Sequence, residues 1–489
     1  MKTDTRNKCM PFKSILRTGA ILTALALSSS ARVSHAGGYE AIQTLAQGGA
    51  FPVNGLAGAS PGSQPDNKPI AGAVFAYRWD GAQYQPTQVI TTAGTGDHLG
   101  MLQILADQDW LVLSAIGTPV GPQVNDTVAN QDFRGAVLVY RLDRDSGQWQ
   151  RTQTLDSSTP GLQGLSTITG GGIPVFLTAQ GADFGLRMAL DAERGWLFVA
   201  ALYQNRVDAQ NQPVINAGTV YAFRLDRPSG RWQFAQAFTN PDGPAPDDGF
   251  GAAVAVKGRY AMISNGPVFQ GPHAGNSAVY VYRLDDGTWS YKQRLTGSQS
   301  GVTPLFFPSF SPDPIGVGDS FGNAIALDQD DAVITAPLES RNVPGAVFTG
   351  AAYFFRREQV PGDERWVVTQ RVESDDPSSF AFGVFNVALD GGTAVIGDIG
   401  WSGPAGTFQG AAHVYRRADT WQKVVTLSDP QGTPSAGFGA GVALGPEGRL
   451  AVGSSPFLGF FVPTIFRPPP AAFPPVAPGK VIVYESADD

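Results

Sequence analysis

A short apolar phrase that recurs along the chain constrains its fold more than any other feature of the sequence. The phrase occurs seven times, opens with Gly or Ser, and ends with Arg or Glu. Each copy is a β-branched and aromatic run that follows a turn residue, so each predicts a β-strand. The copies are GAVFAYR at Gly72, GAVLVYR at Gly135, GTVYAFR at Gly218, SAVYVYR at Ser277, GAAYFFR at Gly350, GAAHVYR at Gly410 and GKVIVYE at Gly479.

Three further strands accompany most copies in a constant order. A strand with a Trp or Tyr follows after a short turn, as in QWQRTQTL ending at Leu155 and RWQFAQAF ending at Phe238. A strand that opens with Phe-Gly precedes, as in FGLRMALD at Phe184 and FGNAIALD at Phe321, and a short turn leads from it to an apolar strand such as GWLFVAA at Gly195. Four antiparallel strands joined mostly by hairpins, repeated many times, predict an all-β chain folded as a β-propeller. Seven copies predict seven blades.

The two ends of the chain complement each other. The last copy, GKVIVYESADD, has no Trp strand after it, whereas YEAIQTL at Tyr39 matches the pattern WQRTQTL without the preceding strands. We therefore expect the N-terminal strand to complete the last blade and close the ring, which leaves no strand edge unpaired. Leu45 and Gly72 are too close for a full inner hairpin, so Phe51–Gly62 predicts a degenerate first blade with either three or four strands.

The order Phe-Gly, VALD-like strand, hairpin, AVITAP-like strand and GAAYFFR-like strand resembles the FG-GAP repeats of integrin α-subunits and of bacterial exported proteins. The resemblance covers nearly the whole chain after residue 36 and implies a seven-bladed propeller that serves recognition and adhesion. Calcium-binding repeats of that family carry D-x-D-x-D-G in the first hairpin of the blade. Here the hairpins read LDQDDAV, LDGGTAV and LGPEGRL, and only Asp328, Asp330 and Asp331 come near the oxygen-ligand set of calcium. We expect no cofactor and no metal.

The N-terminal segment has the pattern of a secretory signal peptide. Five basic residues precede the apolar run Ala20–Leu27, and Ser34-His35-Ala36 supplies small residues for cleavage after Ala36. The apolar run is shorter than a membrane span requires. We therefore expect residues 1–36 to be removed, residues 37–489 to form a single propeller domain, and the protein to be periplasmic or extracellular. The one cysteine, Cys9, lies in the signal.

The charge of the expected mature chain bears on its partners. The signal holds six of the 34 Lys and Arg residues and one of the 42 Asp and Glu residues, which leaves a formal charge of −13. An acidic surface disfavours nucleic acid and anionic membranes as partners and suits a soluble monomer.

No motif of the sequence predicts catalysis. His98, His273 and His413 stand in different repeats, and we interpret His413 as a strand residue packed inside a blade. The pairs Asp247-Asp248 and Asp375-Asp376 precede the Phe-Gly step, where an Asp more often orders a turn than serves a glycosidase. Other propeller signatures, a quinoprotein-like LDRDSGQW and an Asp-box-like DDGTW, are explained by hairpin turns.

Loop lengths indicate where binding occurs. The hairpins within strands 1–2 and 3–4 are short, whereas the connections on the other face are long, and recognition usually sits on such loops. The predicted function is non-catalytic binding of a protein or a glycan through that face. The alternatives are a glycoside hydrolase or lyase that uses carboxylates near the central channel, and a structural module of an envelope or surface assembly. The predicted binding residues are the aromatics of two long loops: Phe306, Phe307, Phe310, Phe457, Phe460, Phe461 and Phe466.

Overall fold

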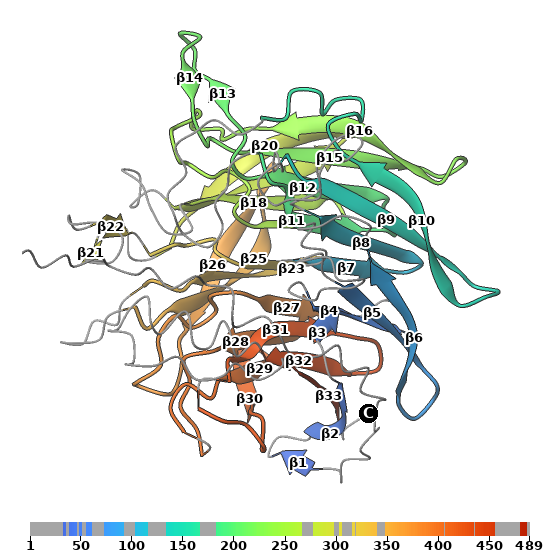
Figure 1. The fold of residues 1–489 in the computed structure, drawn as a ribbon. Helices are drawn as coiled ribbons and strands as arrows, with labels where there is room; N and C mark the ends of the chain where they lie inside the picture. The colour runs from blue at the N-terminus through green and yellow to red at the C-terminus, as the bar shows by residue number, and fades with distance from the viewer. Residues whose placement is uncertain are drawn as a thin grey trace, which may run out of the picture.

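Every regular element in the described part of the structure is a β-strand. The computed structural model describes residues 33–35, 39–45, 48–50, 55–60, 73–91, 103–115, 134–166, 182–266, 277–297, 303–305, 315–317, 319–339, 348–404, 406–434, 436–454 and 480–486. The described strands form six four-stranded sheets, one five-stranded sheet and two separate pairs, all antiparallel. Together the larger sheets make a β-propeller (Figure 1).

The four-stranded sheets follow the chain in order. The first three are β3 to β6 (Gly48–Ala50, Gly55–Ser60, Ala73–Trp79, Tyr84–Thr91), β7 to β10 (Ile104–Asp107, Trp110–Ala115, Ala136–Asp143, Gln148–Leu155) and β11, β12, β15 and β16 (Phe184–Asp191, Trp196–Ala201, Thr219–Asp226, Arg231–Phe238). The others are β17 to β20 (Val254–Lys257, Tyr260–Asn265, Ala278–Asp285, Thr288–Leu295), β23 to β26 (Ile325–Asp328, Asp331–Ala336, Ala351–Val360, Asp363–Val372) and β27 to β30 (Val387–Asp390, Thr393–Asp398, Ala411–Arg417, Trp421–Leu427). The separate pairs are β13 with β14 (Arg206–Val207, Pro213–Val214) and β21 with β22 (Thr303–Leu305, Ile315–Val317).

The five-stranded sheet joins the two ends of the chain. Its order is β1 (Val33–His35), β2 (Tyr39–Leu45), β33 (Val481–Ser486), β32 (Leu450–Ser454) and β31 (Phe438–Leu444). The expected pairing of the N-terminal strand with the last phrase is present, in a register that runs from Tyr39 opposite Ser486 to Leu45 opposite Val481. The described residues form six four-stranded blades rather than the seven predicted, because the sheet that joins the two ends of the chain has β1 as a fifth strand. We call this five-stranded sheet the closing sheet.

The first sheet keeps four strands despite its short sequence. The segment that we expected to compress two strands contributes β3, which has only three residues, and β4, which pairs with β5 from Gly55 opposite Arg78 to Ser60 opposite Ala73. The blade is therefore reduced in the length of its first strand rather than in the number of its strands.

Burial explains why the recurring phrase is continuously apolar. Strands β8, β12, β18 and β24 are buried at every residue, and the first five residues of β9, β15, β19 and β25 are buried as well. Each sheet packs between two others, so both faces of its middle strands are shielded from water. These strands therefore do not alternate between apolar and polar residues. The outermost strands, such as β16 and β20, are largely exposed between a few buried positions.

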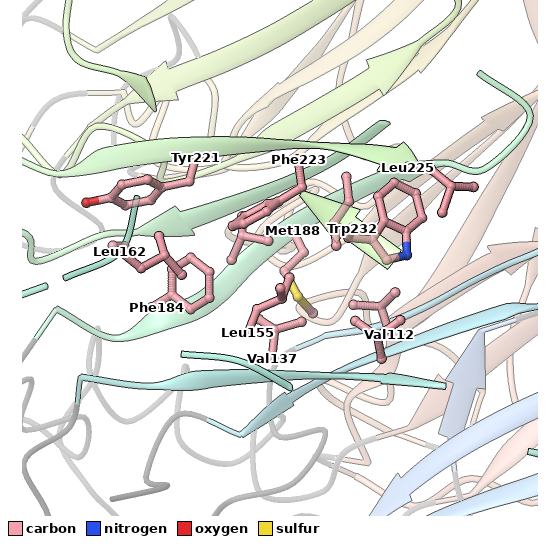
Figure 2. Packing of buried hydrophobic residues seen from close by; sticks show 14 of the residues in the cluster. Val112, Val137, Leu155, Leu162, Phe184, Met188, Tyr221, Phe223, Leu225 and Trp232 are labelled. Atoms are coloured by element: carbon pink, nitrogen blue, oxygen red, sulfur yellow. The ribbon is translucent and has the colours of Figure 1, made fainter. Parts of the chain in front are cut away.

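The core lies between neighbouring sheets, as Figure 2 shows for the cluster between the second and third sheets. Val112 and Val137 of the second sheet face Met188 and Phe223 of the third, and Trp232 of the outermost strand covers one end. Six further clusters of this kind link the other larger sheets, and the one that contains Leu45, Tyr77 and Val483 links the closing sheet to the first. Apolar packing between sheets thus continues around the whole set.

The Phe-Gly step and the Gly of the recurring phrase form one joint between sheets. Gly218 makes a parallel bridge with Phe250 of the next sheet, whose N–H donates to the Ala217 carbonyl at 3.1 Å. Gly218 has a φ of +81°, and a Cβ there would lie 2.3 Å from the Phe250 oxygen. The same approach recurs at Gly135, Gly350 and Gly410. The repeat therefore requires Gly because the backbones of adjacent blades touch.

A glutamine in the outermost strand of each of five sheets, and in β2 of the closing sheet, clamps the next sheet. Gln153 donates from Nε2 to the Trp232 carbonyl at 2.9 Å and accepts from the Trp232 N–H through Oε1 at 2.9 Å. A β-bulge precedes Gln153 in the β9–β10 ladder. The outermost strand has a free edge, so this glutamine pairs backbone groups that the ladder leaves open. Equivalent pairs are Gln43 with Tyr84, Gln88 with Trp149, Gln236 with Trp289, Gln293 with Trp366 and Gln370 with Trp421.

Candidate functional site

The connections divide the propeller into two unequal faces, as the sequence predicted. Strands β7 and β8 are separated by two residues, and so are β19 and β20. On the other face, β8 connects to β9 from Ala115 to Ala136, and β20 connects to β23 from Leu295 to Ile325. The pairs β13–β14 and β21–β22 project on this second side, opposite the tips of β5–β6 and β9–β10 (Figure 1). We call it the long-connection face.

The aromatic residues predicted to bind a partner lie outside the described residues. Phe306, Phe307 and Phe310 fall in the segment between β21 and β22, and Phe457, Phe460, Phe461 and Phe466 fall between β32 and β33.

The acidic pairs that precede the Phe-Gly step order the turns of this face. Asp248 is buried and accepts from Asn240 Nδ2 at 2.6 Å and from Asn265 Nδ2 at 2.7 Å. Asp376 accepts from the Ser378 N–H at 2.8 Å and from the Ser402 N–H at 2.7 Å. The structural interpretation of these carboxylates is therefore the better one, because their oxygens hold neighbouring loops.

Acidic side chains also hold the connections of the fourth and fifth sheets. The Tyr280 hydroxyl donates to Asp242 at 2.8 Å, and the same carboxylate pairs with Arg294 at 3.1 Å. In the next sheet the Tyr353 hydroxyl donates to the buried carboxylate of Glu339, which also pairs with an arginine of β26. In both sheets an acid that contacts a hydroxyl and a cation links a long connection to the blade.

His413 occupies the corresponding position of the sixth sheet. Its side chain is buried, as predicted for a strand residue inside a blade. Nε2 lies 3.2 Å from the buried carboxylate of Asp398, Nδ1 lies 3.0 Å from the Thr426 hydroxyl, and Asp398 also accepts from Ser379 at 2.5 Å. This network satisfies the buried Asp398 and ties three strands to the turn that enters the sheet.

The hairpin that came nearest to a calcium loop uses its carboxylates for other contacts. Asp330 pairs with Arg357, Asp331 pairs with Arg356 and Arg417, and Asp328 accepts from the Gly391 N–H at 3.0 Å. In the part of the chain that the structure describes, no group of three or more acidic, His or Cys side chains is arranged to hold a metal ion.

A second set of carboxylates lies at the short-hairpin end of the innermost strands. Asp107 accepts from the Ala192 N–H at 2.7 Å, and Asp191 accepts from the Gly258 N–H at 2.7 Å, so each acid reaches the hairpin of the next sheet. Burial raises the pKa of Asp107 and of Asp390, and the ammonium of Lys257 opposes both shifts. These carboxylates link adjacent hairpins on the face with the least loop surface.

At the long-connection end, the first strand of the third sheet begins with an unusual polar set. Asp183 precedes Phe184, Arg187 follows it by three residues, and Tyr203 lies just beyond β12. The Tyr203 N–H donates to the Ala182 carbonyl at 3.3 Å, which places the two turns together. None of these three residues was predicted from the sequence as a site residue. The repeat contained the signal, because the matching positions of the other sheets bear no charge.

Comparisons with known proteins concern the fold only. No protein-family model and no curated protein matches the chain. A solved structure from Bacteroides uniformis ATCC 8492, of a protein proposed to be a 6-phosphogluconolactonase, shares 8% identity with a TM-score of 0.44 over 78% of this chain and 83% of that one. A similarly described protein from Bacteroides fragilis NCTC 9343 shares 10% identity with a TM-score of 0.42 over 78% and 84% of the two chains. Among the described residues, no helix is long and apolar enough to cross a membrane. The chain is a β-propeller protein built from four-stranded antiparallel blades.

Proposed function

We propose that this chain is an exported, non-catalytic binding protein that recognises a protein or a glycan through its long-connection face. The observation that carries the proposal is the asymmetry of the connections, because every long connection between described strands emerges on the same side of a rigid set of sheets. Recognition residues concentrate on such loops when a scaffold holds them in place.

The propeller of this proposal has seven blades, with the five-stranded sheet as the seventh. Two observations support this count. The innermost strands contact one another in a closed order, β3, β7, β11, β17, β23, β27, β31 and again β3. Strand β1 lies in the segment that we expect to be removed with the signal peptide, and its loss would leave a four-stranded closing sheet.

The joint between Gly218 and Phe250 supports the resemblance to FG-GAP repeats. It gives a physical reason for both residues of the Phe-Gly step and for the Gly of the recurring phrase. We infer that the chain is organised as an FG-GAP-type propeller without calcium, since Asp330 and Asp331 pair with arginines. We propose that it acts outside the cytoplasm as a monomer, and that neither nucleic acid nor a membrane is its partner.

A capture experiment tests the proposal. Residues 37–489 are immobilised and exposed to envelope extracts and to a glycan array, beside a Phe460→Ser, Phe461→Ser variant. The matched control carries Val89→Ser and Val368→Ser, which remove two exposed apolar side chains from outermost strands. We expect a saturable partner that the first variant loses and the control retains.

Three outcomes of the same experiment would count against the proposal. Capture that both variants retain would exclude the predicted aromatic residues as the binding site. Turnover of a glycan by the wild type, abolished in a folded Asp376→Asn variant, would favour the carbohydrate-active enzyme. Stable co-purification with several envelope proteins, unaffected by the aromatic variant, would favour the structural module.

A further inference from the structure

The repeat provides an internal comparison that singles out one corner of the long-connection face. The residue before the Phe-Gly step has a positive φ in each of five described sheets, which suits Gly or a small residue. Only the third sheet has a charged residue there, and only the third sheet has a charged residue three positions after the Phe. The first position is Asp183, Gly249, Ser320, Ala381 and Gly437, and the second is Arg187, Ala253, Ala324, Phe385 and Gly441.

Asp183 occupies its position at a cost. Its φ is +49°, a conformation that a non-Gly residue adopts rarely, and its side chain is 4% exposed. The Oδ1 atom is buried and has no hydrogen-bond partner. Burial raises the pKa of this carboxyl well above its ordinary value. The positive φ belongs to the repeat, because the matching residues of the other four sheets share it. The buried oxygen without a hydrogen-bond partner is particular to Asp183, and such a group points to a functional position.

Arg187 brings a positive charge to the same corner. Its Nε donates to the Ala252 carbonyl at 3.0 Å and its Nη1 donates to the Leu186 carbonyl at 3.3 Å. The described residues offer it no carboxylate within ion-pair distance, and the side chain keeps part of its surface exposed. Burial lowers its pKa, yet a guanidinium remains protonated in proteins. The remaining donors can therefore meet an anion that enters from solvent.

Tyr203 completes the corner. Its ring packs beside Leu186, Leu202 and Ala252. Burial raises the pKa of the hydroxyl to about 12, with Asp183 contributing in the same direction and Arg187 opposing it. The exposed carboxylate nearby, Asp247, accepts from Asn216 Nδ2 at 2.8 Å. A hydroxyl beside a cation offers one carboxylate contact and one hydrogen bond.

We propose that Arg187 and Tyr203, at the corner where β11 begins, bind the carboxylate of an acidic sugar. This inference rests on the proposed function and names the class of glycan that the long-connection face takes. The cation pairs with the carboxylate of the sugar, and the Tyr203 hydroxyl contacts one of its hydroxyl groups. The overall negative charge of the chain disfavours a polyanion, so a glycan with isolated acidic sugars fits better.

Titration calorimetry with sodium glucuronate tests the inference on residues 37–489. Glucose is the neutral control, and N-acetylglutamate tests a peptide-like carboxylate. We expect glucuronate to bind and glucose to bind at least tenfold more weakly. Arg187→Gln should lose at least tenfold in glucuronate affinity, and Tyr203→Phe, which keeps the packing of the ring, should lose about threefold. Arg294→Gln, on another sheet of the same face, should bind like the wild type.

Three results would overturn the inference. The first is equal binding of glucuronate and glucose, and the second is tighter binding of N-acetylglutamate than of glucuronate. The third applies if Arg187→Gln does not fold: it is an unchanged glucuronate affinity in a folded Tyr203→Phe variant. Capture of a partner that Phe460→Ser, Phe461→Ser abolishes, without any glucuronate binding, would reject this inference and leave the proposed function standing. Failure of both experiments would reject both.

Discussion

Replacing Gln153 by Met tests whether the glutamine clamps hold the blades together. The variant keeps a side chain of similar length and apolar contact but removes both hydrogen bonds to the backbone of Trp232, each 2.9 Å long. An unpartnered buried backbone group costs about 1–3 kcal/mol, and partial rearrangement lowers the sum. We expect the free energy of unfolding to fall by about 2–4 kcal/mol.

Two measurements follow the change. Urea unfolding monitored by tryptophan fluorescence gives the shift of the midpoint, and amide hydrogen exchange reports the Trp232 N–H directly. The matched control is Gln150→Met on the same strand, because Gln150 is exposed and bonds only to the exposed side chain of Asp143 at 3.1 Å. Exposed substitutions of this kind usually change stability by less than about 0.5 kcal/mol.

The result that would refute the reasoning is specific. If Gln153→Met unfolds at the same urea concentration as Gln150→Met, and the Trp232 amide exchanges no faster than in the wild type, the clamp contributes nothing measurable. A second clamp provides a further check. Gln370 acts at a different interface, so the losses of Gln153→Met and Gln370→Met should add.

Three further predictions concern the joints, the acid response and metal. Gly218→Ala should lower the free energy of unfolding by at least about 2 kcal/mol, because its Cβ would lie 2.3 Å from the Phe250 oxygen. The control Gly243→Ala, which has open space around it, should lower it by about 1 kcal/mol, and urea unfolding measures both variants. Burial raises the pKa of Asp319 to about 6, so the folded chain keeps this proton at pH values where the unfolded chain has lost it. The free energy of unfolding of the wild type, relative to that of Asp319→Asn, should therefore fall as the pH rises from about 4 to 6 and should level off above. Urea titrations across this range measure it, and an increase of the wild-type free energy of unfolding relative to the variant would contradict the sign. Calcium or EDTA should leave the melting temperature within about 1 °C, because the Asp328–Asp331 hairpin pairs with arginines and backbone amides.

The sequence predicted the blade because each strand has its own chemical signature. Strands that are buried on both faces are continuously apolar, and the joints between blades require Gly. The apolar strand and the Gly before it therefore recur together in the sequence. The pairing of β2 with β33 was predictable for the same reason, since a strand type missing at one end was present at the other. Strand β1 was not expected, because three residues with no repeat counterpart carry no such signature.

The contacts between blades were harder to predict than the blades. An aromatic residue followed four positions later by Gln is visible in the sequence, as at Trp149 and Gln153, but its partner lies in the next repeat. Asp183 and Arg187 stand out in the repeat as charged residues that the other copies lack, but the position of Tyr203 beside them depends on the contact between two turns. The aromatic binding residues stay a prediction, because they lie outside the described residues.

The contact between the outer strands β30 and β2 of neighbouring sheets has no glutamine clamp, unlike the equivalent contacts between the other sheets. Trp421 is followed four residues later by Val425, which packs against Tyr39 and Ala41 where the other described joints have a glutamine clamp. The strand Tyr39–Leu45 is held by its ladder to β33 and by the clamp from Gln43 to Tyr84, whereas its side toward β30 has apolar contact in place of a glutamine clamp. The ladder partner β33 comes from the far end of the chain. Such a strand can be exchanged between molecules, since a second copy offers the same segment. At concentrations above the effective concentration of its own terminus, of millimolar order, strand-swapped dimers would form with every native contact preserved.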